Sequence, residues 1–232
     1  MNTTADTGEV KRLFDSGAHF AQVKSRRHPS MKPFLVGQKG RQDIIDLAQT
    51  EAQLEAAKRA MATLAKDGKT VLFVGGKTEI AGIVKEAAEK VGAPYVATRW
   101  LGGTISNWPE IKKRIDRLAD LKEKKAAGTL AKQHTKLEIV RLEREMARLS
   151  ERLDGITELA KRPDALLVVD TKHEKHAVKE ANDAGIPIIA LLSSDCDLAQ
   201  AAYPVVANDS SRETVRLVLG ELAGAYEKGR AA

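Results

Sequence analysis

The stretch TVLFVGGKTE, residues 70 to 79, has the outline of a phosphate-binding loop, with an apolar run, two glycines, Lys77 and Thr78. Such a loop needs G-x-x-x-x-G-K-[ST], because its first glycine opens a turn in which backbone N–H groups surround the phosphates. The fifth residue before Gly76 is Val71, inside the apolar run, so the loop has no room. The dinucleotide fingerprint G-x-G-x-x-G fails as well. We expect the glycines to allow close packing in a tight turn, with an anion held at the following helix start as the alternative.

Other residue types that could do chemistry are also isolated. His173 and His176 are spaced to share a helix face, but no other ligand set in the sequence completes a metal site, so we expect both at the surface. Cys196 stands between Asp195 and Asp197, whose charges disfavour a thiolate, and we expect a small packed residue. The sequence therefore predicts no catalytic residue, no metal site and no cofactor, and so no enzyme.

The charge pattern points to a polyanionic partner. The chain has 232 residues and a formal charge of +6, yet the basic segment, residues 11–41, alone carries +7. A solvated basic surface is the open alternative. No apolar run is long enough for a membrane helix, and the first residues lack a signal-peptide pattern. With a single cysteine, these features lead us to expect a cytoplasmic protein without a membrane partner.

The elements that must position these residues alternate along the chain. Apolar runs predict strands, and helical periodicity or capping signals predict the segments between them. Strands are expected at 70–74, 95–98, 164–170, 186–192 and 203–207, and helices at 7–16 (capped by Thr7), 49–66, 77–91, 174–184 and 211–226. Segments 34–36 and 43–47 are expected to pair as a hairpin. Continuously apolar strands alternating with helices indicate a doubly wound, mainly parallel α/β sheet, flavodoxin-like or Rossmann-like.

One long charged stretch does not fit this alternation. Apolar residues recur there at 3-4 spacing in two runs: Trp108, Ile111, Ile115 and Leu118, then Ile139, Leu142, Met146, Leu149, Leu153 and Ile156. So narrow a stripe is typical of an antiparallel coiled coil, whereas two helices lying flat on the core would need a wider one. We expect an inserted coiled-coil helical hairpin at 104–156, a core at 49–103 and 157–232, and a basic N-terminal region at 1–48.

Several stretches resemble one known family. RWLGGTISNWPEIKKRIDRL (99 to 118), the run from 142 to 170 and AVKEANDAGIPIIAL (177 to 191) resemble the bacterial small-subunit ribosomal protein S-two family. GAHF at 17–20, DIIDL at 43–47 and VLFVG at 71–75 extend the resemblance over nearly the whole chain. The chain departs from the family pattern at Ala21 and Gln22, at Arg27 and His28, and at Leu198.

The resemblance implies a structural role and not an enzymatic one. It implies binding of small-subunit ribosomal RNA near the head–body junction, contacts with neighbouring subunit proteins and help in docking ribosomal protein S-one. The protein would be a monomer within the ribosome, with no small-molecule substrate. A nucleotide- or sugar-phosphate-binding enzyme and a coiled-coil adaptor for a protein partner remain the alternatives.

Phosphate contacts from Lys and Arg should dominate such RNA binding. The predicted contacts are Lys24, Arg26, Arg27, Lys32, Lys39 and Arg41 in the basic segment, Arg99 and Trp100 in the RWLGG element, and Lys112, Lys113 and Arg114 at the hairpin root. Trp100 has two interpretations, stacking on a base or filling the space between sheet and hairpin. With few aromatic residues, recognition should be of RNA shape and backbone.

Overall fold

The computed structural model describes residues 8–231, so the predicted cap at Thr7 lies outside the described residues. Its centre is a five-stranded parallel sheet in the order β5-β4-β6-β7-β8. The strands are β4 (Val71–Val74), β5 (Tyr95–Val96), β6 (Ala165–Val169), β7 (Ile188–Leu192) and β8 (Tyr203–Val206). All five predicted strands are present, and the doubly wound α/β prediction is confirmed at this level.

Two apolar clusters enclose the sheet, because successive residues of a strand point to opposite faces. Val71 and Phe73 of β4 pack in the cluster with α2 (Leu47–Lys66), α3 (Ala81–Lys90) and α8 (Arg212–Ala231). Leu72 and Val74 pack in the other, with α7 (Lys175–Asp183) and the root of the helical hairpin. Within the described residues, no helix combines the length and apolar character needed to cross a membrane.

The strand order places a crevice at the carboxyl ends of the parallel strands, between β4 and β6. Chain order reverses between β4 and β6, which pair in register Val71↔Ala165 through Val74↔Val168. In open α/β sheets, ligands bind outside the carboxyl ends of the strands at such a reversal. The residues after Val74 and after Val169 therefore form the edge at which an enzymatic site would lie.

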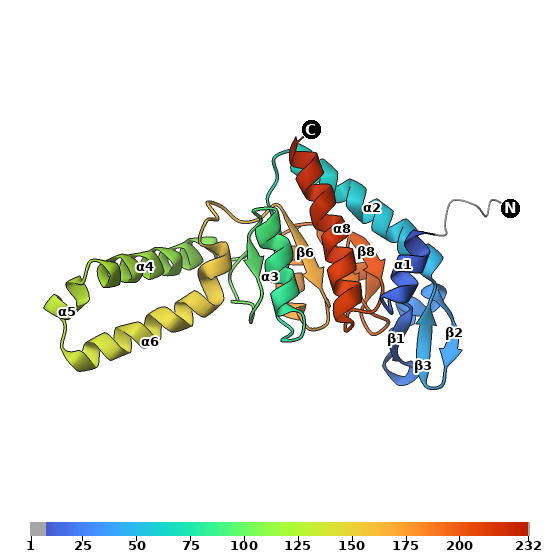
Figure 1. Ribbon diagram of the computed structural model, residues 1–232, viewed down its shortest axis with the longest axis horizontal. Helices are drawn as coiled ribbons and strands as arrows, with labels where there is room; N and C mark the ends of the chain where they lie inside the picture. Colours follow the sequence, from blue (N-terminus) through green and yellow to red (C-terminus); the bar gives the residue numbers. More distant parts are fainter. Residues whose placement is uncertain (1–7, 232) are drawn as a thin grey trace.

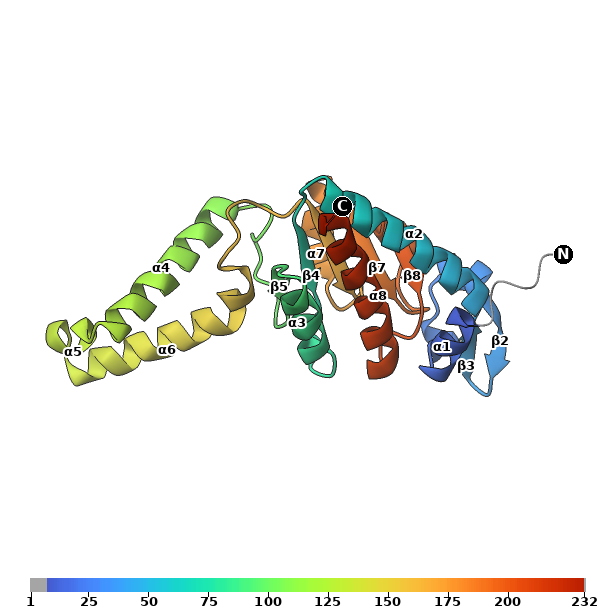
Figure 2. The same ribbon diagram turned by 45° about the horizontal axis from the view of Figure 1, so that its top comes forward.

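The N-terminal region adds a small antiparallel sheet after α1 (Glu9–Asp15). The predicted hairpin forms between β2 (Leu35–Lys39) and β3 (Gln42–Ile45). An unpredicted strand, β1 (Phe20–Val23), pairs with the other edge of β3. Figures 1 and 2 show this sheet at the right-hand end of the molecule, beside α1.

A helical hairpin projects from the opposite end of the sheet (Figures 1 and 2). It consists of α4 (Trp108–Ala126), the short unpredicted helix α5 (Thr129–Gln133) and α6 (Lys136–Leu153). The predicted stripe residues are all buried or half-buried. Ion pairs Arg117–Glu145 and Lys125–Glu143 also join α4 to α6. The inserted hairpin is present, while its supercoiling as a coiled coil stays a prediction.

Two helix boundaries differ from the sequence prediction by four residues or more. Helix α3 begins at Ala81 and not at Lys77, because residues 77–80 form a turn closed by the hydrogen bond from Ile80 N to Lys77 O (3.0 Å). This turn leaves the Lys77 side chain beside the sheet edge. Helix α8 continues to Ala231, five residues beyond the predicted end at Tyr226.

Candidate nucleic-acid interface

The glycine pair at the end of β4 is packed against protein atoms. A Cβ on Gly75 would lie 2.7 Å from Cγ2 of Val84, and one on Gly76 would lie 2.4 Å from the carbonyl oxygen of Thr98. The N–H of Gly76 donates to Oε1 of Glu174 at 2.8 Å. Glu174 thus accepts the hydrogen bond from Gly76 that a bound anion would need. The glycines therefore serve close packing, which is the first of the two interpretations given from the sequence.

Lys77 is likewise engaged inside the molecule. Its Nζ lies 2.5 Å from Oδ2 of Asp170 and 3.6 Å from Oδ1 of Asp209. Asp170 follows β6 in a left-handed conformation with φ of 63°, held by backbone donors from Lys172 and His173. The carboxylates at the β4–β6 reversal therefore neutralise Lys77 and leave it no free charge for a phosphate, although Gly76 and Glu174 line a pocket beside it.

The charges of this network shift the pKa values of its members. Burial, followed by the nearby Asp170 charge, raises the pKa of Asp209 to about 6. Burial also opposes ionisation of Asp170, but the hydrogen bond from Lys77 and the backbone N–H of His173 outweigh it and hold that pKa below its ordinary value. Burial and the charge of Asp170 raise the pKa of Cys196 to about 12, so its thiol stays protonated.

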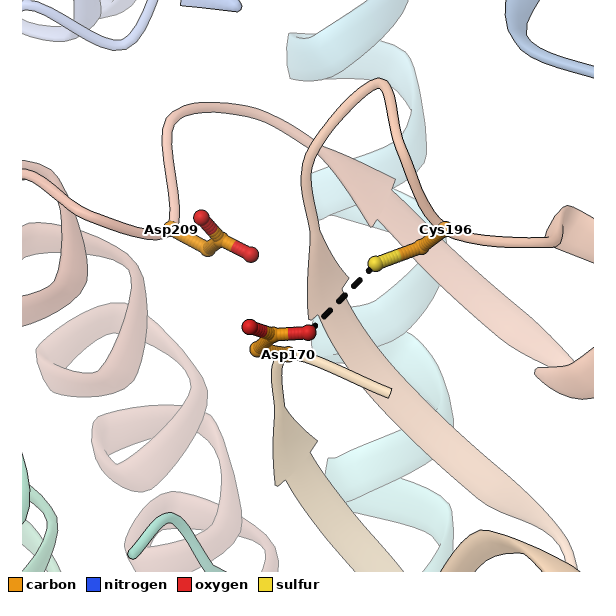
Figure 3. Close-up of side chains that lie close together, drawn as sticks. All are labelled: Asp170, Cys196 and Asp209. Carbon is orange, nitrogen blue, oxygen red and sulfur yellow. Dashed lines mark hydrogen bonds between the residues drawn. The ribbon is translucent and has the colours of Figure 1, made fainter. Parts of the chain in front are cut away.

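Asp170, Cys196 and Asp209 offer ligand atoms that all lie within 4.8 Å of one another (Figure 3). The Cys196 Sγ donates toward Oδ1 of Asp170 at 3.6 Å. A cation could enter only if the ammonium of Lys77 left the carboxylates and the thiol lost its proton. The two predicted surface histidines, His173 and His176, are exposed.

Sequence reasoning missed this network, although a signal for it was present. Lys77 and Asp209 follow predicted strands and Asp170 ends one, and carboxyl ends of parallel strands meet at one edge of the sheet. Combining the strand prediction with the charged residues just after each strand would have placed all three together.

The basic segment presents most of its predicted contacts to solvent. Lys24, Arg26, Lys32, Lys39 and Arg41 are exposed, and none forms a salt bridge to another described residue. Lys39 alone has an aromatic neighbour, its Nζ lying 5.8 Å from the ring centre of Phe20. Five uncompensated cations on one small sheet form a surface that suits a polyanion.

The small sheet also brings several of these cations together. Lys24 and Arg41 line one shallow pocket at the β2–β3 turn, and Lys24, Arg27 and Lys32 line a second beside β2. Arg27 is half-buried, and its Nη1 lies 3.6 Å from the buried carboxylate of Asp43. Arg27 therefore compensates an internal charge, unlike its neighbours.

The RWLGG element is tied to α7 through one carboxylate. The Glu180 side chain accepts from Trp100 Nε1 (3.2 Å), the N–H groups of Gly103 (2.8 Å) and Ile105 (3.1 Å), and both donors of Ser106. Burial opposes its ionisation, but these donors hold the pKa of Glu180 below its ordinary value. The Trp100 ring is only 7% exposed and packs in the core, which fits the space-filling interpretation.

Arg99 is exposed beside Trp100 and lines a pocket of about 780 Å³ together with Lys175 and Lys179 of α7. At the hairpin root, Lys112 pairs with Asp116 at 3.2 Å and Lys113 pairs with Glu110 at 3.3 Å. Arg114 is exposed and has no salt bridge among the described residues. The structure thus groups the predicted cations in two places, around the small N-terminal sheet and at the root of the hairpin.

Comparisons with known proteins agree with one another. The family model described as "Ribosomal protein S2" matches residues 13–229. The "Small ribosomal subunit protein uS2" of Thermosynechococcus vestitus is 40% identical over 221 residues, covering 95% of this chain and 84% of that protein. The uS2 of Fusobacterium nucleatum is 38% identical over 95% of this chain and 89% of that protein, and the uS2c of Rhodomonas salina is 39% identical over 95% and 90%.

Proposed function

The chain belongs to the ribosomal protein S2 family, and from this premise we propose that it is a structural component of the small ribosomal subunit that binds ribosomal RNA through the phosphate backbone. Its work is to hold RNA and neighbouring proteins in place during translation. Ribosomal RNA and other small-subunit proteins are its partners.

The observation that carries the proposal is the set of uncompensated cations on the small N-terminal sheet. Exposed Lys24, Arg26, Lys32, Lys39 and Arg41 have no salt bridge among the described residues. Lys and Arg that neutralise phosphates release counterions, which supplies affinity that falls steeply with salt. Exposed Arg99 and Arg114 extend this chemistry toward the hairpin root.

The contacts at the β4–β6 reversal argue against the alternative of a nucleotide- or sugar-phosphate-binding enzyme. The N–H of Gly76 already donates to Glu174, and Asp170 and Asp209 neutralise Lys77. A phosphate would have to enter beside three carboxylates and compete with them for their hydrogen-bond donors. Nucleotides should therefore give no thermal stabilisation of the protein.

Docking of ribosomal protein S-one is the finer part of the proposal, which the family resemblance suggests. The N-terminal region also exposes two large apolar side chains within the basic segment, Phe14 (56% exposed) and Val36 (65% exposed). Exposed apolar groups are typical of protein interfaces. Purified subunits carrying Phe14→Ser and Val36→Ser should hold less S-one, and an unchanged amount would remove these two residues from the docking surface.

The hairpin is proposed to act as a two-helix coiled coil inserted at 104–156 between the core parts 49–103 and 157–232, with 1–48 as the N-terminal region. Burial of the predicted stripe along α4 and α6 supports this. Limited proteolysis tests the division: cleavage should concentrate at the hairpin tip, while the core fragments stay associated.

Sucrose-gradient sedimentation of native lysate tests the proposed function. The protein, followed by mass spectrometry, should co-migrate stoichiometrically with the small subunit and dissociate only as salt rises. Deletion of residues 108–153 separates RNA binding from an adaptor role, because an adaptor would lose ribosome association entirely. A protein that stays at the top of the gradient at every salt concentration would overturn the proposal.

A further inference from the structure

The face of α6 that points away from α4 carries a line of arginines. Helix geometry places Arg144 and Arg148 opposite the apolar stripe that packs toward α4, with Arg141 and Arg152 beside them. All four are exposed and follow one another at spacings of three, four and four residues. We call these four residues the α6 arginine stripe.

The stripe differs from the cations of α4, all of which except Arg114 are ion-paired, in having no ion pair among the described residues. Among the described residues, Lys112, Lys113, Arg117, Lys122, Lys124 and Lys125 each lie within 4.0 Å of a carboxylate. No such pair exists within the described residues for Arg141, Arg144, Arg148 or Arg152.

The carboxylates nearest in sequence do not compensate the stripe. Glu145 and Glu143 pair with Arg117 and Lys125 of α4. Glu138 accepts from the backbone and side chain of Thr135 at the start of α6, and Arg141 makes the smallest contribution to its lowered pKa. Glu151 shares the outer face but forms no salt bridge with a described residue.

Such a line of cations opposes the stability of its own helix. Like charges four residues apart repel, and Arg144, Arg148 and Arg152 form two successive pairs of this kind. Only Arg152, in the last turn, gains from the helix dipole. No described carboxylate forms an ion pair with Arg144 or Arg148 in the interior of α6. We therefore expect the compensating anion on another molecule.

We propose that the α6 arginine stripe binds the phosphate backbone of ribosomal RNA, as a second RNA surface separate from the N-terminal basic segment; this inference rests on the proposed function. The guanidinium fork donates two parallel hydrogen bonds to a phosphate. Successive arginines are displaced by about 4.5–6 Å along the helix axis, so the stripe can contact several phosphates in a row.

The shape and position of the stripe support RNA as the occupant. Arg141, Arg144 and Arg148 line a shallow groove of about 400 Å³ on one flank of α6, together with Glu145 and Leu149. The groove surroundings are mainly cationic, which favours a phosphate backbone over an apolar helix of another protein. Because the hairpin and the small sheet project from opposite ends of the core (Figures 1 and 2), the two surfaces contact different RNA segments.

The test measures binding of the full-length protein to small-subunit ribosomal RNA transcribed in vitro, at several salt concentrations. The stripe variant is Arg144→Gln, Arg148→Gln and Arg152→Gln, which retains good helix formers. The control variant, Lys122→Gln, Lys124→Gln and Lys125→Gln, loses the same charge from the same hairpin, but its residues are ion-paired. A third variant, Lys24→Gln, Lys32→Gln and Arg41→Gln, reports on the basic segment. Circular dichroism confirms that each variant is folded.

The stripe variant should lose at least about tenfold in affinity near 0.1 M salt. The salt slope, which is the slope of the logarithm of the binding constant against the logarithm of the salt concentration, should fall in magnitude by about 3 in the stripe variant and by less than about 1 in the control variant. Unchanged affinity and slope in the stripe variant, with weakened binding in the basic-segment variant, would overturn this inference and leave the proposed function intact. Normal RNA binding with loss of a protein from stripe-variant subunits would assign the stripe to an acidic protein and overturn it too. If the affinity of the wild-type protein for RNA does not change with salt concentration, that result would instead overturn the proposed function.

Discussion

Glu180 on α7 accepts a hydrogen bond from the indole N–H of Trp100 at 3.2 Å, across a stretch of eighty residues in the chain. The same carboxylate accepts from the backbone N–H groups of Gly103 and Ile105, in the loop that leads into α4. One side chain thus fixes the loop between the sheet and the helical hairpin. Its position determines where the cations of the hairpin lie relative to the core.

Glu180→Ala should lower the free energy of unfolding by about 2–4 kcal/mol, because several donors lose a charged acceptor at once. Urea unfolding measures the change. Glu227→Ala is the control, since Glu227 is exposed on α8 and is expected to change stability by less than about 0.5 kcal/mol. Equal effects of the two substitutions would show that the Glu180 hydrogen bonds do not stabilise the fold.

Helix α8 offers a matched test of close packing. A Cβ on Gly229 would lie 2.4 Å from the carbonyl oxygen of Ala62 on α2, whereas one on Gly220 would meet nothing within 4 Å. Gly229→Ala should therefore destabilise the protein by more than about 1 kcal/mol. Gly220→Ala should stabilise it by about 0.5–1 kcal/mol through helix propensity. Thermal melting of both variants decides this, and a stabilised Gly229→Ala would contradict the helix contact.

Asp209 makes a specific contribution to the pH dependence of stability. Its pKa is raised to about 6 from the ordinary 3.8, so between these values the folded protein binds more protons than the unfolded chain. Ionised Asp209 therefore costs stability above pH 6, and this cost fades as the pH falls from 6 toward 4. Asp209→Asn should raise the free energy of unfolding at pH 8 by about 1–3 kcal/mol, with a gain that shrinks by pH 5.

Denaturant unfolding of wild type and Asp209→Asn at pH 5, 6, 7 and 8 measures this difference. A gain from Asp209→Asn that is constant from pH 5 to 8 would show that Asp209 does not titrate in this range.

The sequence was sufficient for features that depend on local pattern. The apolar run Val71–Val74 is buried on both faces, and such a run has few alternatives to a central parallel strand. The stripe from Trp108 to Leu118 likewise predicted one arm of the hairpin. Pairs such as Lys112–Asp116 follow from their spacing of four residues alone.

Features that depend on distant pairing were missed. Strand β1 is only four residues long, and its pairing with β3 is irregular between Phe20 and Val23, so no alternation marks it. The partners of Lys77 lie on two other strand ends. Whether a cation is paired or free, as at Arg144, depends on neighbours across the hairpin that composition does not reveal.

Cys196 should be unreactive in the folded protein. Its side chain is 1% exposed, and burial together with the charge of Asp170 raises its pKa to about 12. Because the thiolate is the reactive form, alkylation by iodoacetamide at pH 8 should be at least about 100-fold slower in native protein than in urea-unfolded protein. Mass spectrometry follows the reaction. Similar rates in both states would mean that the crevice opens readily.

The last prediction concerns the basic segment and its share of RNA binding. Exposed Lys24, Lys32 and Arg41 have no salt bridge among the described residues, so changing all three to Gln should remove about three phosphate contacts. The salt slope of binding to small-subunit ribosomal RNA should fall by about 3. The loss should be uniform across RNA sequences, because phosphate contacts carry no base information.

The matched control removes the same charge elsewhere, with Lys66→Gln, Lys90→Gln and Lys228→Gln on the exposed surface of α2, α3 and α8. If net charge alone governs binding, both triple variants will weaken it equally, since each lowers the total charge by three. If the small sheet contacts RNA directly, only its own variant will lose the steep salt dependence. Equal losses would therefore assign the affinity to the long-range field of a basic protein and not to the surface formed by β1, β2 and β3.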